Sequence, residues 1–383
     1  MASTTPLLAQ QINSPADIPP EDVHDGITRI LALPDGRMRD VMLGSVLTGL
    51  LLRGPRLGEV EAAVRAATAL DRSGWDFHRP PDGLRFVGYT GSGKKTFKTI
   101  NLSTAAALVA ATGGAHIAKL GSRSASSKTG SRDFFDLVGA AGDAVPHREM
   151  VDITAETGFG FFSIENRVPE FDCRYGGRFQ AVHALSLAFP ALLSPVMCDA
   201  YVYGLSHPAV GASARLLSRL GLPEVTVINS SLGRAVQVDE LLPGSTARIC
   251  RIGADEEDLL FGNEVCQAVA SMPQDLLSVS QHEDPRANVA AAISVLAGQD
   301  SGQARNAVAL NAALLMVTSE VVPTVQSGID TALTIINSGA GLDTLQRFVR
   351  LTGGSAGQLR SLLRPVTPVS LPAVPGAKEA APC

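Results

Sequence analysis

The stretch GYTGSGKKT, which begins at Gly88, carries residue types that bind phosphate groups. It comes close to the pattern G-x-x-x-x-G-K-[ST], in which a glycine-rich backbone and a lysine cradle the phosphates of a nucleotide. Gly88, Gly93 and Lys94 fit this pattern. Lys95, however, stands where a hydroxyl would bind magnesium, and Thr96 comes one residue too late. The stretch is therefore either an altered nucleotide site or part of a different phosphate-binding site.

Lysines are concentrated around this stretch. Five of the six lysines in the sequence fall within one short window: Lys94, Lys95, Lys98, Lys119 and Lys128. Ammonium groups among glycines and serines suit a multiply charged anion, and a solvated basic surface patch is the alternative. The net charge of −5 argues against a general nucleic-acid binder. The window therefore favours a small anionic ligand, and we expect no nucleic-acid partner.

Two segments of this region are expected to join a strand to a helix. The first leads from GYTGSG to NLST, where Ser103 or Thr104 would cap an alanine-rich helix and leave backbone N–H groups free for an anion. The second, KLGSRSASSKTGS, follows the strand-like run HIAKL. Lys119 would thus project from the carboxyl end of a strand, where ligands bind in open α/β sheets. Two such loops could close on one ligand with more than one phosphate. A nucleotide P-loop would not need the second loop, and no later strand that ends in a magnesium-binding aspartate stands out.

The elements that position these loops follow from the apolar pattern. Residues 21–80 predict helices, because apolar residues recur at helical spacing. From about residue 84, the runs LRFVG, HIAKL, VTVIN and ARICRIG alternate with alanine-rich helical stretches, which indicates a mostly parallel sheet. Residues 286–363 again predict helices. The expected fold class is α/β, with a small all-helical domain plus a larger α/β domain whose mostly parallel central sheet is flanked by helices.

Each domain is expected to take two segments of the chain, with irregular termini outside them. The N-terminal segment is polar and punctuated by prolines, and the C-terminal segment is proline-rich. The expected boundaries are 1–20 for a loose N-terminal arm, 21–80 and 164–195 for the helical domain, 81–163 and 196–363 for the α/β domain, and 364–383 for a disordered tail.

Composition excludes several classes of protein. Apolar residues make up 45% of the chain and charged residues 18%, so a substantial core is available. The longest apolar runs are too short to cross a bilayer, and the N-terminal segment lacks the pattern of a secretory signal. The five cysteines are scattered and never spaced C-x-x-C, which favours buried thiols over a disulfide framework or a zinc site. A cytoplasmic protein without membrane contact is expected.

The window NLSTAAALVAATGGAHIAKLGSRSASSKTGS resembles the anthranilate phosphoribosyltransferase family, whose core reads G-T-G-G-D-G…T-F-N-I-S-T…V-A-K-H-G-N-R-S-x-S-S-x-x-G-S. The likeness extends to an N-terminal helix pair and to the C-terminal helices, so it covers roughly residues 25–352 and is weakest in the middle. Nucleoside phosphorylases share this fold, but their motifs fit the chain less well. The family is commonly a homodimer through its helical domain, and a homodimer is expected here.

The resemblance implies a reaction and a set of site residues. In the family, 5-phosphoribosyl 1-pyrophosphate (PRPP) lies between the two domains, magnesium ions hold its pyrophosphate, and pyrophosphate leaves as an acceptor attacks C1 of the ribose. Such a displacement requires no general base, so no catalytic side chain is assigned, and His116 and His183 are expected to be core or surface residues. The PRPP-binding positions carried over from the family are Gly88, Gly91, Ser92, Gly93, Asn101, Ser103, Thr104, Lys119, Gly121, Ser126, Ser127 and Gly130.

Magnesium would also need acidic ligands. The family's Asp-Glu pair has a candidate in VDELLPGSTARI, which gives Asp239 and Glu240, and Ser103 would lie near a metal. The competing acids are those of GADEEDLL, which could instead be a solvated surface run. We favour Asp239 and Glu240 as the magnesium ligands. The acids of GADEEDLL are Asp255, Glu256, Glu257 and Asp258.

The chain departs from the family mainly on the acceptor side. Ser92 replaces an aspartate of the first loop, Leu120 replaces a histidine and Ser122 replaces an asparagine. An acceptor-binding arginine falls in the weakest part of the resemblance, where Arg174 or Arg178 could meet an acceptor carboxylate. These departures predict an acceptor other than anthranilate, either another aromatic acid or an amine of a specialised biosynthetic pathway. A phosphorylase-like enzyme and a non-catalytic ligand-binding or nucleic-acid-binding protein are the alternatives.

Overall fold

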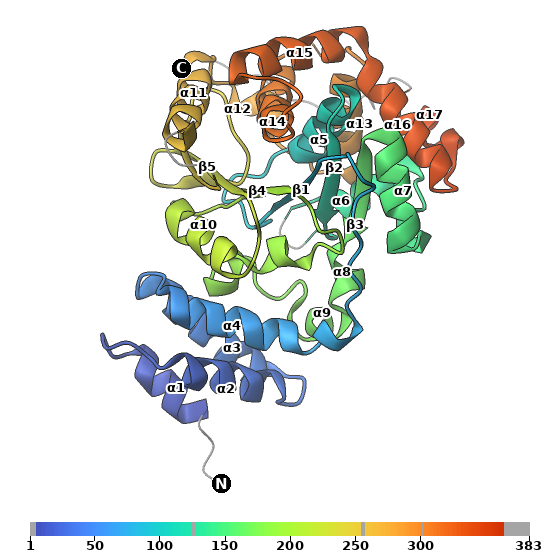
Figure 1. Cartoon of the computed structure of the whole chain (residues 1–383). Coiled ribbons are helices and arrows are strands. Elements are labelled where there is room, and N and C mark those ends of the chain that lie inside the picture. Colours follow the sequence, from blue (N-terminus) through green and yellow to red (C-terminus); the bar gives the residue numbers. More distant parts are fainter. Residues whose placement is uncertain (1–4, 125–126, 254–256, 301, 364–383) are drawn as a thin grey trace, which may run out of the picture.

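A seven-stranded sheet forms the centre of the larger domain (Figure 1). The computed structural model describes residues 5–124, 127–253, 257–300 and 302–363. In these ranges the strands follow the order β3-β2-β1-β4-β5-β6, and β7 also pairs with β5. The first five strands are parallel, whereas β6 and β7 run antiparallel to β5. The predicted mostly parallel sheet is confirmed. The strands are β1 (Phe86–Gly91), β2 (His116–Gly121), β3 (Phe159–Ser163), β4 (Ala200–Gly204), β5 (Val225–Leu232), β6 (Val236–Val238) and β7 (Thr246–Ile252).

Strands of the parallel part of the sheet are buried on both faces, as parallel strands covered by helices must be. All five residues of β3 and all five of β4 are buried. The sequence runs LRFVG, HIAKL, VTVIN and ARICRIG predicted β1, β2, β5 and β7 correctly. Neither β3 nor β4 was predicted, because both are short and contain glycine, which weakens the strand signal. The register places Tyr89 of β1 beside Lys119 of β2.

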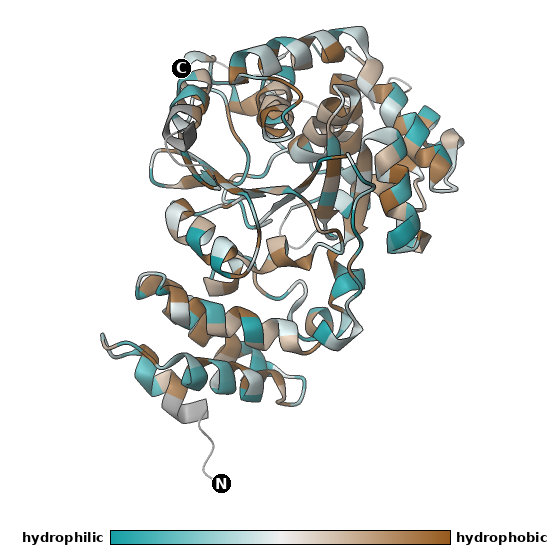
Figure 2. Ribbon diagram, viewed as in Figure 1, coloured by the Kyte–Doolittle hydropathy of each residue, from teal (hydrophilic) through white to brown (hydrophobic). Residues whose placement is uncertain are grey.

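Helices cover both faces of this sheet. Figure 1 shows α5 and the C-terminal helices on one side of it and α10 on the side that faces the helical domain. Apolar residues of α5 and α14 face the interior, whereas hydrophilic residues gather on outer surfaces (Figure 2). The helices are α5 (Leu102–Thr112), α6 (Ser131–Val138), α7 (His147–Thr157), α10 (Val210–Arg219), α11 (Glu257–Ser271), α12 (Leu276–Val279), α13 (Pro285–Leu296), α14 (Ala304–Thr318), α15 (Val325–Ser338), α16 (Ala340–Leu351) and α17 (Ala356–Leu362).

The helical domain joins two segments that are distant in the sequence. Its first helices lie beneath the sheet in Figure 1, and α3 and α4 contact the 3₁₀ turn η3 of the second segment. The first segment contains α1 (Thr5–Ile12), α2 (Pro20–Leu31), α3 (Arg37–Leu52) and α4 (Leu57–Ala69). The second contains α8 (Ile164–Arg167), α9 (Pro169–Tyr175), η3 (Ala184–Leu187) and η4 (Phe189–Leu193).

The N-terminal arm differs from the expectation. Residues 5–12 form helix α1, and Leu8 is buried with 1% of its surface exposed. A Cβ at Gly26 of α2 would lie 2.2 Å from the Leu8 side chain, so the glycine allows the close approach of α1 to α2. The prediction of a loose arm is therefore wrong for these residues. The predicted disordered tail lies outside the described residues, and the domain boundaries remain a prediction.

A polar cluster connects the linker after α4 to both domains. The carboxylate of Asp76 receives hydrogen bonds from His78 (2.7 Å), from His147 of α7 (3.1 Å) and from Arg167 of α8 (2.8 Å). The guanidinium of Arg167 is buried and lies 4.7 Å from the ring centroids of both Trp75 and Phe77. This cluster fixes the position of α8, and α8 forms part of the wall of a cavity. Within the described part of the chain, no helix has the length and apolar character needed to cross a membrane.

Candidate active site

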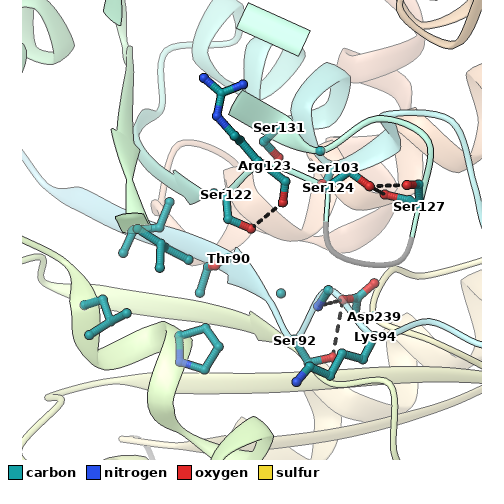
Figure 3. Close-up of a pocket in the computed structure, with 18 of the residues that line it drawn as sticks. Thr90, Ser92, Lys94, Ser103, Ser122, Arg123, Ser124, Ser127, Ser131 and Asp239 are labelled. Carbon is teal, nitrogen blue, oxygen red and sulfur yellow. Dashed lines mark hydrogen bonds between the residues drawn. The ribbon is translucent and has the colours of Figure 1, made fainter. Parts of the chain in front are cut away.

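A cavity of about 390 Å³ lies where the sheet meets the second segment of the helical domain (Figure 3). One wall is formed by the carboxyl ends of β1 and β2 and by the loops that follow them. The opposite wall comes from α8, α9 and the η3–η4 turns. Ligands bind at the carboxyl ends of parallel strands in open α/β sheets. The cavity therefore has the location that the two loops predicted.

The loop after β1 is held in place by Asp239. The backbone N–H of Gly93 donates a hydrogen bond to Asp239 Oδ2 over 2.8 Å, and Gly93 has a φ of +69°, which favours glycine. A Cβ at Gly91 would lie 2.7 Å from the same carboxylate oxygen. Ser92 Oγ accepts a hydrogen bond from the backbone N–H of Ser206 over 3.0 Å and lies 3.4 Å from Asp239 Oδ2. These contacts explain the two glycines of the loop.

The loop after β2 closes against the start of α5. Asn101 is the residue before α5, and its side-chain amide donates to the carbonyl oxygen of Gly130 over 3.3 Å. The carboxylate of Asp133 accepts hydrogen bonds from the backbone N–H groups of Ser124 and Gly130, both over 2.8 Å. The helix cap predicted at Ser103 or Thr104 is thus wrong, since α5 begins at Leu102. The side chain of Asn101, the residue before α5, makes no capping hydrogen bond, and the amino end of the helix faces the cavity through Ser103 (Figure 3).

Two buried carboxylates form the acidic part of the cavity. Asp239 and Glu240 are 5% and 2% exposed. Lys95 Nζ lies 2.5 Å from Glu240 Oε1 and 3.7 Å from Asp239 Oδ1. Within the described residues, Asp239 Oδ1 and Glu240 Oε2 lack a hydrogen-bond donor. Burial raises the pKa of Glu240 to about 7, against the attraction of Lys95. Buried carboxylate oxygens without donors are the ligands that magnesium prefers, so this pair fits a divalent cation.

Lys119 supplies a second buried ammonium group. Only 2% of its surface is exposed, and its Nζ lies 4.5 Å from the ring centroid of Tyr89 on the neighbouring strand. Burial lowers the pKa of Lys119 to about 8, although Glu240 and Asp239 oppose this shift. A cation held in this way can bind a phosphate group at little further cost in side-chain ordering.

One side of the cavity is mostly apolar. Leu120 and Ser122, which the sequence analysis expects to contact an acceptor, line the cavity. Ser122 Oγ donates a hydrogen bond to the carbonyl oxygen of Arg123 over 2.9 Å (Figure 3). Lys94 reaches the opposite wall, where its Nζ contacts Tyr175 and His183. The apolar wall residues are Ile164, Val168, Phe171, Leu185, Phe189 and Leu193.

Comparison with known proteins agrees with this geometry. Residues 84–342 match the model of the glycosyl transferase family, a/b domain. Over 342 residues the chain is 30% identical to an anthranilate phosphoribosyltransferase of Burkholderia mallei (strain SAVP1), with 87% of this chain and 94% of the relative covered. An enzyme of the same name from Paracidovorax citrulli (strain AAC00-1) is 31% identical, with 87% and 93% covered.

The chain belongs to the anthranilate phosphoribosyltransferase family. It is therefore a glycosyltransferase of the phosphoribosyltransferase type. The crystal structure of anthranilate phosphoribosyltransferase from Thermus thermophilus covers 92% of this chain and 100% of its own, with 26% identity and a TM-score of 0.69. The Saccharomyces cerevisiae enzyme in complex with PRPP and Mg covers 92% and 99%, with 18% identity and a TM-score of 0.72, and shows the fold alone.

Most of the residues predicted for this phosphoribosyltransferase line the cavity, and a few do not. Gly88 is a packing residue, because a Cβ there would lie 2.5 Å from the ring of Tyr201, and Thr104 is fully buried. Ser126, Asp255 and Glu256 fall outside the described residues, as do the side chains of Glu257 and Asp258. The predicted residues on the wall are Gly91, Ser92, Gly93, Asn101, Ser103, Lys119, Leu120, Gly121, Ser122, Ser127, Gly130, Asp239 and Glu240.

The two arginines predicted for the acceptor differ from the expectation. Arg174 pairs with Glu170 one turn earlier on α9, over 2.9 Å. Arg178 pairs with Asp40 of α3 over 2.9 Å and also contacts Asp35. Neither belongs to the cavity wall. Their carboxylate partners on the helical domain hold both guanidinium groups outside the cavity.

The sequence did not predict the contact of Lys94 with Tyr175 and His183 on the wall opposite the loops. The sequence places Lys94 only in the lysine cluster around the first loop, and it predicts His183 to be a core or surface residue. The signal available in the sequence was the lysine cluster itself, since Lys94 occupies the residue directly after the loop glycine Gly93. Its partner Tyr175 lies 81 residues away in the sequence, and no local pattern indicates that distance.

Proposed function

We propose that this chain transfers the 5-phosphoribosyl group of PRPP to a small aromatic acceptor, with magnesium as cofactor and release of pyrophosphate. The observation that carries the proposal is the single cavity in which both loops, the buried Lys119 and the carboxylates Asp239 and Glu240 meet. In this cavity Lys119 offers a positive charge to the pyrophosphate, and the two carboxylates offer negative charge to the magnesium ion. Homologues named for this reaction and a structural neighbour that holds PRPP and Mg support the assignment.

For this reaction the protein must position the two reactants and stabilise the charge that develops on pyrophosphate. The bond between C1 of the ribose and the pyrophosphate oxygen breaks, a bond from C1 to the acceptor nitrogen forms, and that nitrogen loses its proton. Negative charge grows on the leaving pyrophosphate, where Lys119 and the amino end of α5 stabilise it. Asp239 and Glu240 would hold magnesium, which neutralises the pyrophosphate when bound. The rigid loops and the apolar wall hold donor and acceptor in line.

The acceptor is the narrower part of the proposal. The relatives are named for anthranilate, which makes anthranilate the reference acceptor. The wall residues Leu120 and Ser122 motivate the alternative of a different aromatic acid or amine. That alternative stays a prediction, as do a homodimer and a cytoplasmic location.

The donor and the acceptor can be tested separately. Thermal unfolding should show that PRPP together with MgCl₂ raises the melting temperature well above either alone, because ligands that bind the folded state stabilise it. Pyrophosphate release should then be assayed with anthranilate, the isomeric aminobenzoates and anilines. Absence of stabilisation by PRPP and MgCl₂ would refute the transferase. Release with an aniline or another acid but not with anthranilate would establish a changed acceptor. Release of a free base from nucleosides by inorganic phosphate would indicate a phosphorylase instead.

A further inference from the structure

The acceptor side of the cavity contains an ammonium group without a carboxylate partner. Lys94 Nζ donates a hydrogen bond to Tyr175 Oη over 2.5 Å and lies 2.7 Å from His183 Nε2. Tyr175 Oη and His183 Nε2 also contact each other. Only 8% of Lys94 is exposed. Among the described residues, no carboxylate oxygen lies within 4.0 Å of Lys94 Nζ, so the ammonium group has no salt bridge.

The other two buried lysines of the cavity have carboxylates that offset their burial. Lys95 contacts Glu240 directly. Lys119 makes no ion pair within 4.0 Å among the described residues, but the charges of Glu240 and Asp239 favour its ammonium form, whereas no such charge acts on Lys94. Burying an ammonium without an opposite charge costs free energy. The fold accepts that cost at Lys94 alone among the three. The cost is removed when a ligand brings an anionic group to this position.

The surroundings of Lys94 suit a flat apolar molecule. The rings of Phe171 and Tyr175 are stacked with centroids 4.7 Å apart, and Phe189 lies 4.6 Å from Phe171. Leu185 and Leu193 continue this wall. An aromatic body can pack on such a surface, and its single charged substituent would face the lysine.

We propose that Lys94 recognises the acceptor, through an ion pair between its ammonium group and a carboxylate on an aromatic acceptor bound against this wall. Tyr175 and His183 position the lysine from α9 and from the start of η3. Arg174 and Arg178 cannot take this role in the observed arrangement, because carboxylates of α9 and α3 hold them. The inference rests on the proposed phosphoribosyl transfer and names the residue that would decide its acceptor class.

The charge balance around Lys94 gives the proposal a second readout. The titratable groups in contact with its Nζ are Tyr175 and His183, while Asp172 of α9 and Glu165 of α8 line the cavity beyond ion-pair distance. Burial lowers the pKa of Lys94 to about 7, and burial together with Lys94 holds the pKa of His183 well below its usual value. A bound carboxylate would raise the pKa of Lys94. At pH 8, therefore, binding of an aromatic acid should take up a proton.

Calorimetric titration of the full chain with acids and matched amides tests this inference. The probes are anthranilate, 3-aminobenzoate and 4-aminobenzoate, each beside the amide that lacks the charge. In the presence of MgCl₂ and pyrophosphate, we expect at least one acid to bind, and its amide to bind about 10-fold or more weakly. Titrations at pH 8 in two buffers of different ionisation enthalpy should show uptake of close to one proton per acid bound.

Three variants separate recognition from folding. Lys94→Met should weaken binding of the acid about 10- to 100-fold and abolish the proton uptake, with little change for the amide. It should also keep or raise the melting temperature, because it removes an unpaired buried charge. Lys94→Arg should retain part of the preference for the acid. Lys128→Met is the matched control, because Lys128 pairs with Glu283 at the surface, and it should leave binding of the acid unchanged.

Pyrophosphate is the other anion that could reach Lys94, and PRPP titrations distinguish it. A Lys94→Met chain that loses affinity for PRPP with MgCl₂ but keeps its affinity for the acid would overturn the inference. So would equal binding of acid and amide by the wild-type chain, or the absence of binding by all three acids. A wild-type chain that does not bind PRPP with MgCl₂ at all would instead refute the proposed transferase activity, which is a different outcome from the loss of acid binding.

Discussion

Lys95 Nζ lies 2.5 Å from Glu240 Oε1, so the chain supplies its own cation to the carboxylate pair proposed to bind magnesium. The same ammonium group donates a hydrogen bond to Thr99 Oγ1 over 2.7 Å. The lysine and a metal ion would therefore compete for Glu240. This relationship makes the stability of the chain and its affinity for magnesium depend on one side chain.

Replacing Lys95 by methionine should separate these two effects. Without metal, Lys95→Met leaves two adjacent buried carboxylates and should lower the free energy of unfolding by about 3–5 kcal/mol. With the competing ammonium gone, magnesium should bind more tightly and recover most of that loss. Urea unfolding and MgCl₂ titrations of the melting temperature measure both effects, with Lys128→Met as control. Equal stabilisation of wild type and Lys95→Met by MgCl₂ would show that Lys95 and the metal do not compete.

A negative charge introduced at Ser92 should make the thermal stability of the chain depend on magnesium. Its Oγ lies 3.4 Å from Asp239 Oδ2, so Ser92→Asp would bring a third carboxylate into a buried acidic site. We expect a lower melting temperature than wild type without metal, since like charges repel strongly when buried. MgCl₂ should remove most of the difference. Ser92→Asn is the uncharged control of similar size. If the asparagine variant shows the same loss and the same response to MgCl₂, charge is not the cause.

The Asp76 cluster predicts how stability changes with pH. Burial raises the pKa of Asp76, but hydrogen bonds from His78 and His147 outweigh this effect and lower it to about 2. The folded-state pKa is thus below the usual 3.8, so the carboxylate stabilises the fold above about pH 4 and loses this effect as the pH falls towards 2. Asp76→Asn should therefore lower the free energy of unfolding at pH 6, and the difference from wild type should shrink below pH 4.

Urea unfolding followed by circular dichroism at pH 6, 5, 4 and 3.5 measures this trend. Asp82→Asn is the matched control in an exposed turn of the same linker, and it should match wild type at each pH. A difference between Asp76→Asn and wild type that stays constant down to pH 3.5 would assign the loss to packing instead of the charge of Asp76.

Docking of α1 should contribute to the stability of the helical domain. Leu8 is buried against α2 at Gly26, so Leu8→Ala should cost about 2–3 kcal/mol of unfolding free energy. Leu52→Ala in α3 is the control, because 80% of Leu52 is exposed and its loss should change stability by no more than about 0.5 kcal/mol. Urea unfolding compares the two. Equal stability of Leu8→Ala and wild type would mean that α1 does not hold the domain together.

The two loops of the cavity could be predicted from the sequence because their signals are local. Glycines, serines and lysines in two short windows mark the loops after β1 and β2. Asp239 and Glu240 follow β6, a strand too short to stand out in the sequence, and only the resemblance to the family indicated them. The acceptor side could not be predicted. Arg174 and Arg178 are turned away by carboxylates of α9 and α3, while Lys94 meets His183 across 89 residues of chain. The direction of a long side chain depends on such distant partners, which leave no pattern in the sequence.

The two loops that would hold the donor come from one stretch of the chain, and the apolar wall that would hold the acceptor comes from another, the segment between β3 and β4. Because these stretches do not overlap, an exchange of residues 164–193 for the corresponding segment of a relative would alter which molecules are accepted while the phosphate-binding loops stay as they are. Among the described residues, the long side chain of Lys94 reaches from the first stretch to Tyr175 in the second. In an engineered chimera it is the side chain that would have to be chosen together with the new wall.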